Sequence, residues 1–463
     1  MTKVGEIIQH FKNARFQYCA SLKQCSASTA AKPTEFAKQQ KCNNYMLNGR
    51  PRQHTGSAIL LYHPVFGNFL SNLQSSDSLP PKFYELIFDY FCTSQEIYDE
   101  TRDSRGSTSW DASIRLGLED LLDKLWKISE PGALHDVTAV GSSGSYCLIL
   151  EIKKRDWHCR VWQSSKLLNQ CFCPSILIAI AGPWMCILGA VFFDRPIVQP
   201  LTDFIWVGIN PSKPREVSFV ARVFHSVLKA RRELETYYAN LTGPATLENV
   251  PAPSVPLPYL THFIDDDGHR VEFTYTIHVN IMSVEPASHL KHSAPHSPPT
   301  PIVVKFVEGY NVDAHKLLAK EGLAPKLLYD GTIHTNDQLG PDYSMIVMEY
   351  IYGIDLGCYA GLSLPLCVSD DIDRALSLLH AQDLVFGDLR APNIMLAMDG
   401  DGKVTGAWLI DFDWCGKHQV DRYPFDMNKN IPWASGVGPG ALLDKRHDIE
   451  MRKSLPYSEN NVL

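Results

Sequence analysis

Residues 380–413 read HAQDLVFGDLRAPNIMLAMDGDGKVTGAWLIDFD. Asp388 and Asn393 stand five residues apart in a polar loop, and Asp411 comes at the end of an apolar run that predicts a buried strand. Between them, the segment DGDGK (399–403) predicts the turn of a two-stranded hairpin. The hairpin therefore connects an acid and an amide to a second acid.

Two acids and an amide in this order suit phosphoryl transfer. That reaction needs an acid beside the attacking hydroxyl, and a second acid with an amide oxygen to hold Mg²⁺ against the phosphates. We expect Asp388 to be the base, and Asn393 and Asp411 to be the metal ligands. A single Asp with an Asn five residues later is usually turn chemistry, so this interpretation needs support from the rest of the chain.

The stretch resembles the protein-kinase and aminoglycoside-phosphotransferase superfamily. There the loop has the pattern H-R-D-x-x-x-x-N or H-G-D-x-x-x-x-N, and the metal motif is D-F-G. Upstream, IVVKFV (302–307) resembles the third kinase strand, which implies that Lys305 binds the α- and β-phosphates of ATP. The segment GLAPKLLYDG (322–331) resembles the passage from helix to strand in the phosphotransferase branch.

A further segment, MIVMEYIYG (345–353), resembles the kinase hinge strand. The resemblance implies that Met348 is the gatekeeper and that the backbone from Glu349 to Ile351 contacts adenine. Four pieces in this order, over residues 258–450, imply an α+β kinase-like domain that uses ATP and Mg²⁺. Its acceptor would be a hydroxyl group on a protein, most simply Ser or Thr, or on a small molecule.

Several departures from the kinase pattern concern regulation. Phe386 and Gly387 replace the His-Arg before the base, and Asp413 replaces the Gly of the metal motif. No G-x-G-x-x-G precedes Lys305. Only 52 residues follow Asp411, which predicts a shortened C-terminal lobe.

The acidic partner that kinases give to the strand lysine is also missing from the next predicted helix. Asp313 and His315 are the nearest candidates, and Asp313 is equally suited to be the N-cap of that helix. Arg390 stands where kinases often place a Lys that neutralises the transferring phosphate. The segment HDIEM (447–451) is a candidate for a buried acidic support of the catalytic loop.

The front half carries a weaker pattern, in which carboxylates and a Lys could also hold Mg²⁺ beside a phosphate group. Asp136 precedes a predicted strand LILEIKK, where Glu151 and Lys153 share one face, and Gln163 falls on the next predicted helix. Two carboxylates beside a Lys can hold Mg²⁺ and hydrolyse a phosphodiester. The order of elements resembles the restriction-endonuclease-like core, a mixed α/β sheet flanked by helices. Fungal and oomycete crinkler-type proteins fuse such a domain to a kinase-like one.

The charge and proline patterns divide the chain. Residues 1–250 hold 27 Lys and Arg against 23 Asp and Glu, whereas the remainder hold 16 against 28. The mildly basic front permits DNA contact without proving it. We predict a polar leader, an endonuclease-like domain, a Pro-rich linker and a kinase-like domain at residues 1–55, 56–242, 243–258 and 259–463.

Composition argues for a reducing compartment. The 12 cysteines include no C-x-x-C pair, and Cys171 and Cys173 form a lone C-x-C. Residues 174–193 are uncharged and long enough to cross a bilayer, but Gly182 and Pro183 interrupt them, which favours two strands. We expect an intracellular protein, cytoplasmic or nuclear, with no membrane partner.

Three functions stay open at this point. The first is an ATP-dependent phosphotransferase with Asp388 as base. The second is a pseudokinase binding module, favoured by the missing Gly-rich loop and acidic partner. The third is a Mg²⁺-dependent nuclease in the front domain that the kinase-like domain regulates.

Overall fold

The chain forms two compact units. One comprises residues 1–260 with 339–341, and the other comprises residues 261–338 with 342–463. Apart from a few single positions before residue 46, the computed structural model describes residues 46–49, 52–94, 118, 120–125, 148–152, 171–181, 184–207, 213–242, 257–265, 267–275, 285–290, 300–333, 339–360 and 363–455. Most of the predicted linker, residues 243–256, lies outside the described residues, so its role as a linker stays a prediction.

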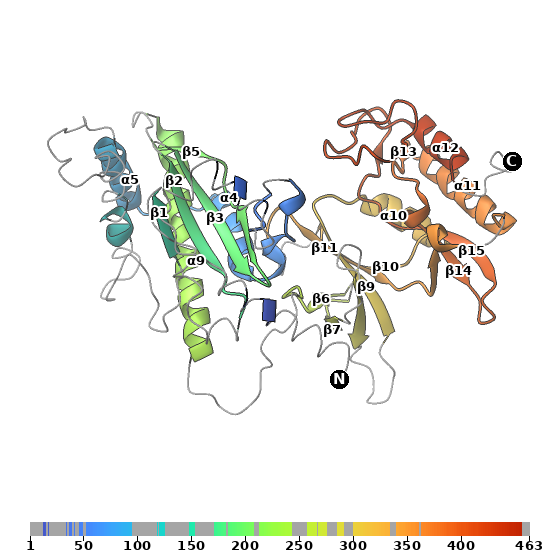
Figure 1. The fold of residues 1–463 in the computed structure, drawn as a ribbon, viewed down its shortest axis with the longest axis horizontal. Coiled ribbons are helices and arrows are strands. Elements are labelled where there is room, and N and C mark those ends of the chain that lie inside the picture. The colour runs from blue at the N-terminus through green and yellow to red at the C-terminus, as the bar shows by residue number, and fades with distance from the viewer. Residues whose placement is uncertain are drawn as a thin grey trace. The chain divides into compact units, whose positions relative to one another are not determined.

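The first unit contains a mixed sheet. Its strands are β1 (Leu148–Ile152), β2 (Ser175–Ala181), β3 (Trp184–Phe192), β4 (Pro196–Pro200) and β5 (Ile205–Trp206). They lie in the order β1-β2-β3-β4, with β5 also paired to β3 (Figure 1). The β1 strand runs parallel to β2, and the other pairs are antiparallel. The sheet is therefore mixed, as predicted, while its endonuclease-like character stays a prediction.

The first unit also contains helices. They are η1 (Arg52–His54), η2 (Ile59–Leu61), α4 (Pro64–Gln74), α5 (Pro81–Ser94) and α9 (Pro214–Thr242). The long helix α9 packs against β2 and also contacts α4 and α5 (Figure 1). Its buried residues include Val220, Phe224, Val227 and Leu234, which recur at helical spacing. This apolar stripe explains why α9 lies along the sheet.

The uncharged segment 174–193 forms two strands, as predicted. In the β2–β3 pair, Ser175 lies opposite Ala190 and Ala181 lies opposite Trp184. No helix among the described residues is both long enough and apolar enough to cross a bilayer. Sequence reasoning missed β4, because the prolines at its two ends obscure the strand pattern.

The second unit begins with an antiparallel sheet. Its strands are β6 (His262–Ile264), β7 (Arg270–Tyr275), β8 (Glu285–Leu290), β9 (Thr300–Val307), β10 (Leu327–Asp330) and β11 (Ser344–Glu349). They lie in the order β10-β11-β9-β8-β7-β6, and every neighbouring pair is antiparallel. The β9 strand, which carries Lys305, is therefore an inner strand with a partner on each side.

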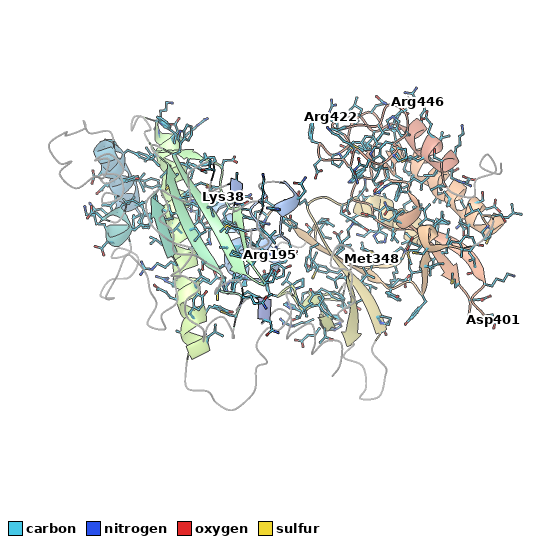
Figure 2. The ribbon with its side chains drawn as sticks, in the orientation of Figure 1. Lys38, Arg195, Met348, Asp401, Arg422 and Arg446 are labelled. Carbon is cyan, nitrogen blue, oxygen red and sulfur yellow. The ribbon has the colours of Figure 1, made fainter. Side chains whose placement is uncertain are left out.

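The rest of this unit combines helices with short hairpins. The elements are α10 (Val312–Lys320), β12 (Gly353–Asp355), η4 (Leu356–Cys358), α11 (Leu366–Ala381), β13 (Leu384–Val385), η5 (Ala391–Asn393), β14 (Ile394–Met398), β15 (Val404–Leu409), β16 (Gly416–Lys417) and α12 (Lys445–Lys453). The predicted hairpin forms from β14 and β15, and Asp401 marks the turn between them (Figure 2). A second small pair joins β13 to β16.

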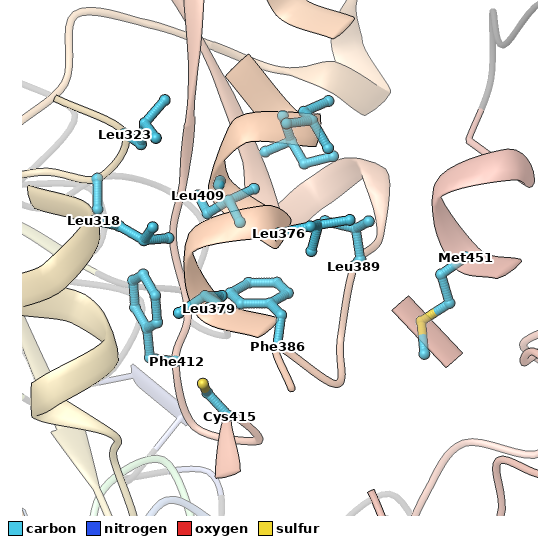
Figure 3. Close-up of a cluster of buried hydrophobic side chains, with 14 of the residues drawn as sticks. Leu318, Leu323, Leu376, Leu379, Phe386, Leu389, Leu409, Phe412, Cys415 and Met451 are labelled. Atoms are coloured by element: carbon cyan, nitrogen blue, oxygen red, sulfur yellow. The ribbon is translucent and has the colours of Figure 1, made fainter. Parts of the chain in front are cut away.

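One hydrophobic core holds these elements together (Figure 3). Helix α11 contributes Val368, Ile372, Ala375, Leu376 and Leu379, all on one face. Helix α10, the β14–β15 hairpin and the loop after β13 add further buried residues to this core, including Leu318, Leu409, Phe386 and Phe412. The loops that carry the predicted catalytic residues therefore start and end in this core.

Removing a core side chain is expected to destabilise the second unit. Leu318 is completely buried, so Leu318→Ala should lower the free energy of unfolding by about 2–5 kcal/mol through lost burial and a cavity. Leu366, which is 78% exposed, provides the matched control, since Leu366→Ala should change stability by less than about 0.5 kcal/mol. Urea unfolding measures both values, and equal losses in the two variants would contradict this core.

Candidate active site

Lys305 supplies the positive charge at the centre of the site. It lies on β9 opposite Ile346 of β11, and its side chain is 14% exposed. Its Nζ donates to Oδ1 of Asp411 and to Oδ1 of Asp413, each at 2.5 Å. The ammonium also lies 5.7 Å from the centre of the Tyr310 ring. A cation with so little access to water needs compensating charge, and the two carboxylates provide it.

Asp411 adopts a strained backbone conformation just after β15. Its φ is +71°, in the left-handed region, which costs a residue with a side chain about 1–3 kcal/mol. On one side, the N–H of Ile410 donates to the carbonyl of Asn393 at 3.0 Å. On the other side, the Phe412 side chain is fully buried. The turn is therefore fixed at both ends and directs the Asp411 carboxylate toward Lys305.

Asp388 and Asn393 are joined directly. Nδ2 of Asn393 donates to Oδ2 of Asp388 at 2.9 Å and to its backbone carbonyl at 3.0 Å. Arg390 donates to both carboxylate oxygens of Asp388, with 2.6 Å between Nη2 and Oδ2. Because the amide nitrogen of Asn393 is committed to Asp388, its amide oxygen is the atom left to ligate a metal.

Arg390 is also held by an aromatic ring. Its guanidinium carbon lies 5.1 Å from the centre of the Trp433 ring, and Trp433 lies 5.3 Å from Trp414. Nε1 of Trp433 donates to the carbonyl of Asn428 at 3.0 Å. This stacking orients the planar guanidinium beside Asp388. Sequence reasoning missed Trp433, because no local pattern relates it to Arg390.

The loop before Asp388 is supported by Asp448 on α12. The Asp448 carboxylate is fully buried. It accepts from the N–H of Phe386 at 2.8 Å and from that of Gly387 at 2.9 Å, and Nε2 of His380 lies 2.9 Å away. The expectation that the HDIEM segment supports this loop is confirmed.

Gly387 has a structural reason to lack a side chain. Its φ is +82°, and a Cβ there would lie 3.0 Å from the carbonyl oxygen of Trp414. Both facts favour glycine at this position. The replacement of the kinase Arg by Gly387 thus matches a tight turn that brings two successive N–H groups to Asp448.

Helix α10 contributes a neutral histidine to the site. His315 is fully buried, and its ring stacks on Phe412 with 4.8 Å between ring centres and 9° between planes. Nε2 lies 2.7 Å from the carbonyl of Pro325, which can only accept, so the proton is on Nε2. Nδ1 is then free to accept from the Tyr310 hydroxyl at 2.9 Å. Burial lowers the pKa of His315 to about 4, in agreement with a neutral ring.

The prediction that Asp313 could be the N-cap of α10 is wrong. Asn311 caps α10, since its side chain accepts from the N–H of Ala314 at 3.0 Å. Asp313 lies in the first turn and is exposed. It neither caps the helix nor pairs with Lys305, which finds both of its carboxylates elsewhere.

The predicted adenine contacts are placed only in part. Met348 is buried on β11 (Figure 2), and Ile351 is 8% exposed just after that strand. The N–H of Glu349 donates to the carbonyl of Lys326 at 3.0 Å, so it is not free to contact a nucleotide. The contact of Ile351 with adenine stays a prediction.

The predicted nuclease cluster lies largely outside the described residues. Glu151 belongs to β1, where its backbone pairs with Ala179 of β2. The side chain of Glu151 and all of Asp136, Lys153 and Gln163 fall outside what the structure describes. The nuclease site therefore stays a prediction.

A cavity of about 620 Å³ borders the site on the side of α10. Its lining includes Asp413, Lys316, Asp330 and Arg422. Burial raises the pKa of the Asp413 carboxyl to about 6, although Lys305 opposes this shift. Asp413 thus pairs with Lys305 and also borders this open, polar cavity.

Comparisons with known proteins find partial likeness among solved structures. No protein-family model matches the chain, and no curated protein matches it. The solved structure of the Cydia pomonella granulovirus kinase PK-1 matches with a TM-score of 0.25 and 18% sequence identity. The match covers 33% of this chain and 55% of that kinase, so this chain spans about half of its length.

Acid should destabilise the second unit through His315. Its pKa is about 4 when folded and about 6.5 in the unfolded chain, so the unfolded chain binds more protons between these values. Stability is therefore full above pH ~6.5 and falls by up to about 3 kcal/mol as the pH drops toward 4. We expect His315→Gln to flatten this part of the stability profile, measured by urea unfolding at a series of pH values.

An exposed histidine provides the control for this measurement. The His269 side chain is 76% exposed, so His269→Gln should leave the pH dependence as it is in the unaltered chain. A profile for His315→Gln that is as steep as that of the unaltered chain would contradict the assignment of a buried neutral ring.

Replacing Asp448 should weaken both the fold and the loop. In Asp448→Asn, the amide group can accept from only one of the two backbone N–H groups, which leaves a buried donor unpaired. The expected loss in unfolding free energy is about 2–4 kcal/mol. Asp401→Asn at the exposed hairpin turn serves as a control and should cost less than about 0.5 kcal/mol. Indistinguishable urea midpoints would show that Asp448 does not support the loop.

Proposed function

We propose that the second unit is a kinase-like phosphotransferase that moves the γ-phosphoryl group of Mg·ATP to a hydroxyl group, with a protein Ser or Thr as acceptor. The observation that carries this proposal is the convergence of Lys305, which is distant in sequence, with three groups from residues 388–411. Lys305 pairs with Asp411, the turn before Asp411 bonds to Asn393, and Asn393 bonds to Asp388. Few functions other than phosphoryl transfer need this set.

Each side chain has a role that its surroundings support. Asp388 would accept the proton of the acceptor hydroxyl as its oxygen attacks the γ-phosphorus, with ADP leaving on the opposite side. Lys305 would bind the α- and β-phosphates, and Arg390 would neutralise charge on the transferring group. The oxygens of Asn393 and Asp411 fit Mg²⁺, which would shield the phosphate charges when bound.

The adenine side would be shaped by β11 and the residues that follow it. Met348 supplies an apolar wall from within the sheet, and the backbone at Ile351 would provide the polar contact. The β9 strand places Lys305 beside β11. The phosphates and the base would therefore occupy one face of the β9–β11 pair.

A pseudokinase is the second candidate, and one contact favours it. Arg390 donates to both oxygens of Asp388, and Asn393 adds a third donor. These donors occupy most of the lone-pair positions of the carboxylate, although Oδ1 accepts only from Arg390. A carboxylate held in this way is a weaker proton acceptor, which hinders a catalytic base but not a nucleotide-binding scaffold.

Asp388→Asn separates the two candidates. For an active phosphotransferase, we expect phosphoryl transfer to fall by about 10²–10⁴-fold, because the base acts on the acceptor hydroxyl. The affinity for Mg·ATP should change by less than about twofold, because the base does not bind the nucleotide. Transfer of labelled phosphate to a protein mixture measures the rate, and calorimetry measures the affinity.

Two further variants sharpen this test. Asp383→Asn makes the same change on the loop but at an exposed residue that pairs with Lys445, and it should leave both quantities unaltered. Asp411→Asn should remove the part of the nucleotide affinity that depends on Mg²⁺. Unaltered protein that binds Mg·ATP but transfers no phosphate would establish the pseudokinase, and protein that binds no nucleotide would refute both.

A further inference from the structure

Helix α10 offers no carboxylate to the site. Its inward residues are apolar or neutral, with Val312, Ala314, His315 and Leu318 all buried. Its acidic residue within the first turn, Asp313, is exposed. A partly buried Lys305 nevertheless requires a negative neighbour, since an unpaired buried ammonium is strongly unfavourable. The compensating charge must come from another element.

The segment after β15 supplies that charge twice. Asp411 and Asp413 both accept from Nζ of Lys305 at 2.5 Å. The side chain between them, Phe412, is buried between His315 and Phe386, with ring centres 4.8 Å and 5.5 Å away. Because Phe412 is fixed in the core, the acids before and after it are both held beside Lys305.

Asp413 is also fixed relative to β9 by the chain that follows that strand. The N–H of Asn311 donates to the carbonyl of Phe412 at 3.1 Å, and Nδ2 of Asn311 donates to the carbonyl of Cys415 at 3.2 Å. The same Asn311 caps α10. The start of α10 and the segment bearing Asp413 are therefore bonded together through one residue.

We propose that Asp413 is the standing counter-ion of Lys305 and positions its ammonium for the nucleotide phosphates, in place of an acid on α10. This inference rests on the proposed function, in which Asp411 is needed as a metal ligand. An acid that ligates a metal cannot also fully neutralise Lys305. A second acid resolves the conflict, because Asp413 pairs with the ammonium and orients it while Asp411 serves the metal.

The replacement of Gly by Asp at position 413 and the absence of an inward acid on α10 thus have one explanation. In this arrangement, the ion pair does not depend on the rotation of α10 about its own axis. Movement of that helix would carry the Asp413 segment with it through Asn311.

The first experiment uses the protein without nucleotide. An amine-reactive acylating reagent modifies accessible lysine side chains, and modification of Lys305 is followed by peptide mass spectrometry. The Asp413 carboxylate holds and covers Nζ of Lys305, so Asp413→Asn should raise the modification rate by about 3–10-fold. Asp413→Glu keeps the charge and should retain the slow rate. Asp313→Asn, the matched change on α10, should also leave it unaltered.

The second experiment measures nucleotide affinity with and without Mg²⁺ by calorimetry. A positioning role for Lys305 predicts that Asp413→Asn weakens ATP binding by about 5–10-fold in both conditions, which corresponds to about 1 kcal/mol. Asp411→Asn should instead weaken binding only when Mg²⁺ is present. Thermal unfolding of each variant identifies any that fail to fold.

The outcomes separate the inference from the proposed function. An unchanged modification rate in Asp413→Asn overturns the ion-pair role, even if ATP binds normally. A loss of affinity confined to Mg²⁺ conditions overturns the positioning role and makes Asp413 a metal ligand. If the unaltered protein binds no nucleotide, the proposed function fails and positioning fails with it, while the modification rates still establish or refute the Lys305–Asp413 pair.

Discussion

The candidate site depends on one buried carboxylate, that of Asp448. A buried anion persists only where donors satisfy it, and here two successive backbone N–H groups and His380 do so. Both N–H groups can point to one carboxylate because Gly387 adopts a positive φ. Asp388 is the next residue, so its position follows from this contact. The geometry of the loop that carries Asp388 is thus set from α12, which lies about 60 residues later in the sequence.

A second constraint comes from the hydrophobic core through Phe412. This ring packs between His315 of α10 and Phe386 of the loop before Asp388, within the cluster that Figure 3 shows. Burial of one apolar side chain therefore links the helix, the loop and the end of β15. The burial of Phe412 thus also fixes the backbone of the polar residues on either side of it. Their direction toward Lys305 is a consequence of core packing.

The sequence predicts those parts of the site that depend on local order. Asp388, Asn393 and Asp411 fall where a loop and a hairpin place them, and Lys305 follows from the resemblance of IVVKFV to the third kinase strand. The support from Asp448 was expected because the HDIEM segment resembles a buried, acid-bearing helix that supports the corresponding loop in kinases. The contacts of Trp433 and Asp413 join loops without periodicity, so no local pattern indicates them. The prediction of an N-cap at Asp313 failed for a related reason. Asn311 and Asp313 are both good N-caps, and only the backbone geometry decides between them.

The charged side chains of the site pair with one another, and this limits the electrostatic free energy that ligand binding can gain. Lys305 is neutralised by two acids, and Arg390 neutralises Asp388. A bound nucleotide with its metal would replace these ion pairs by other ion pairs of a similar kind. The electrostatic contribution to binding is therefore the difference between two paired states. Affinity must then come from new contacts at the adenine side and from the metal. Turnover also depends on movement of the Arg390 guanidinium from Asp388 to a phosphate. Stacking on Trp433 must therefore orient the guanidinium without preventing this movement. The same residues therefore permit a scaffold or an enzyme, and the strength of the Arg390–Asp388 pair relative to the Arg390–phosphate pair determines which one this unit is.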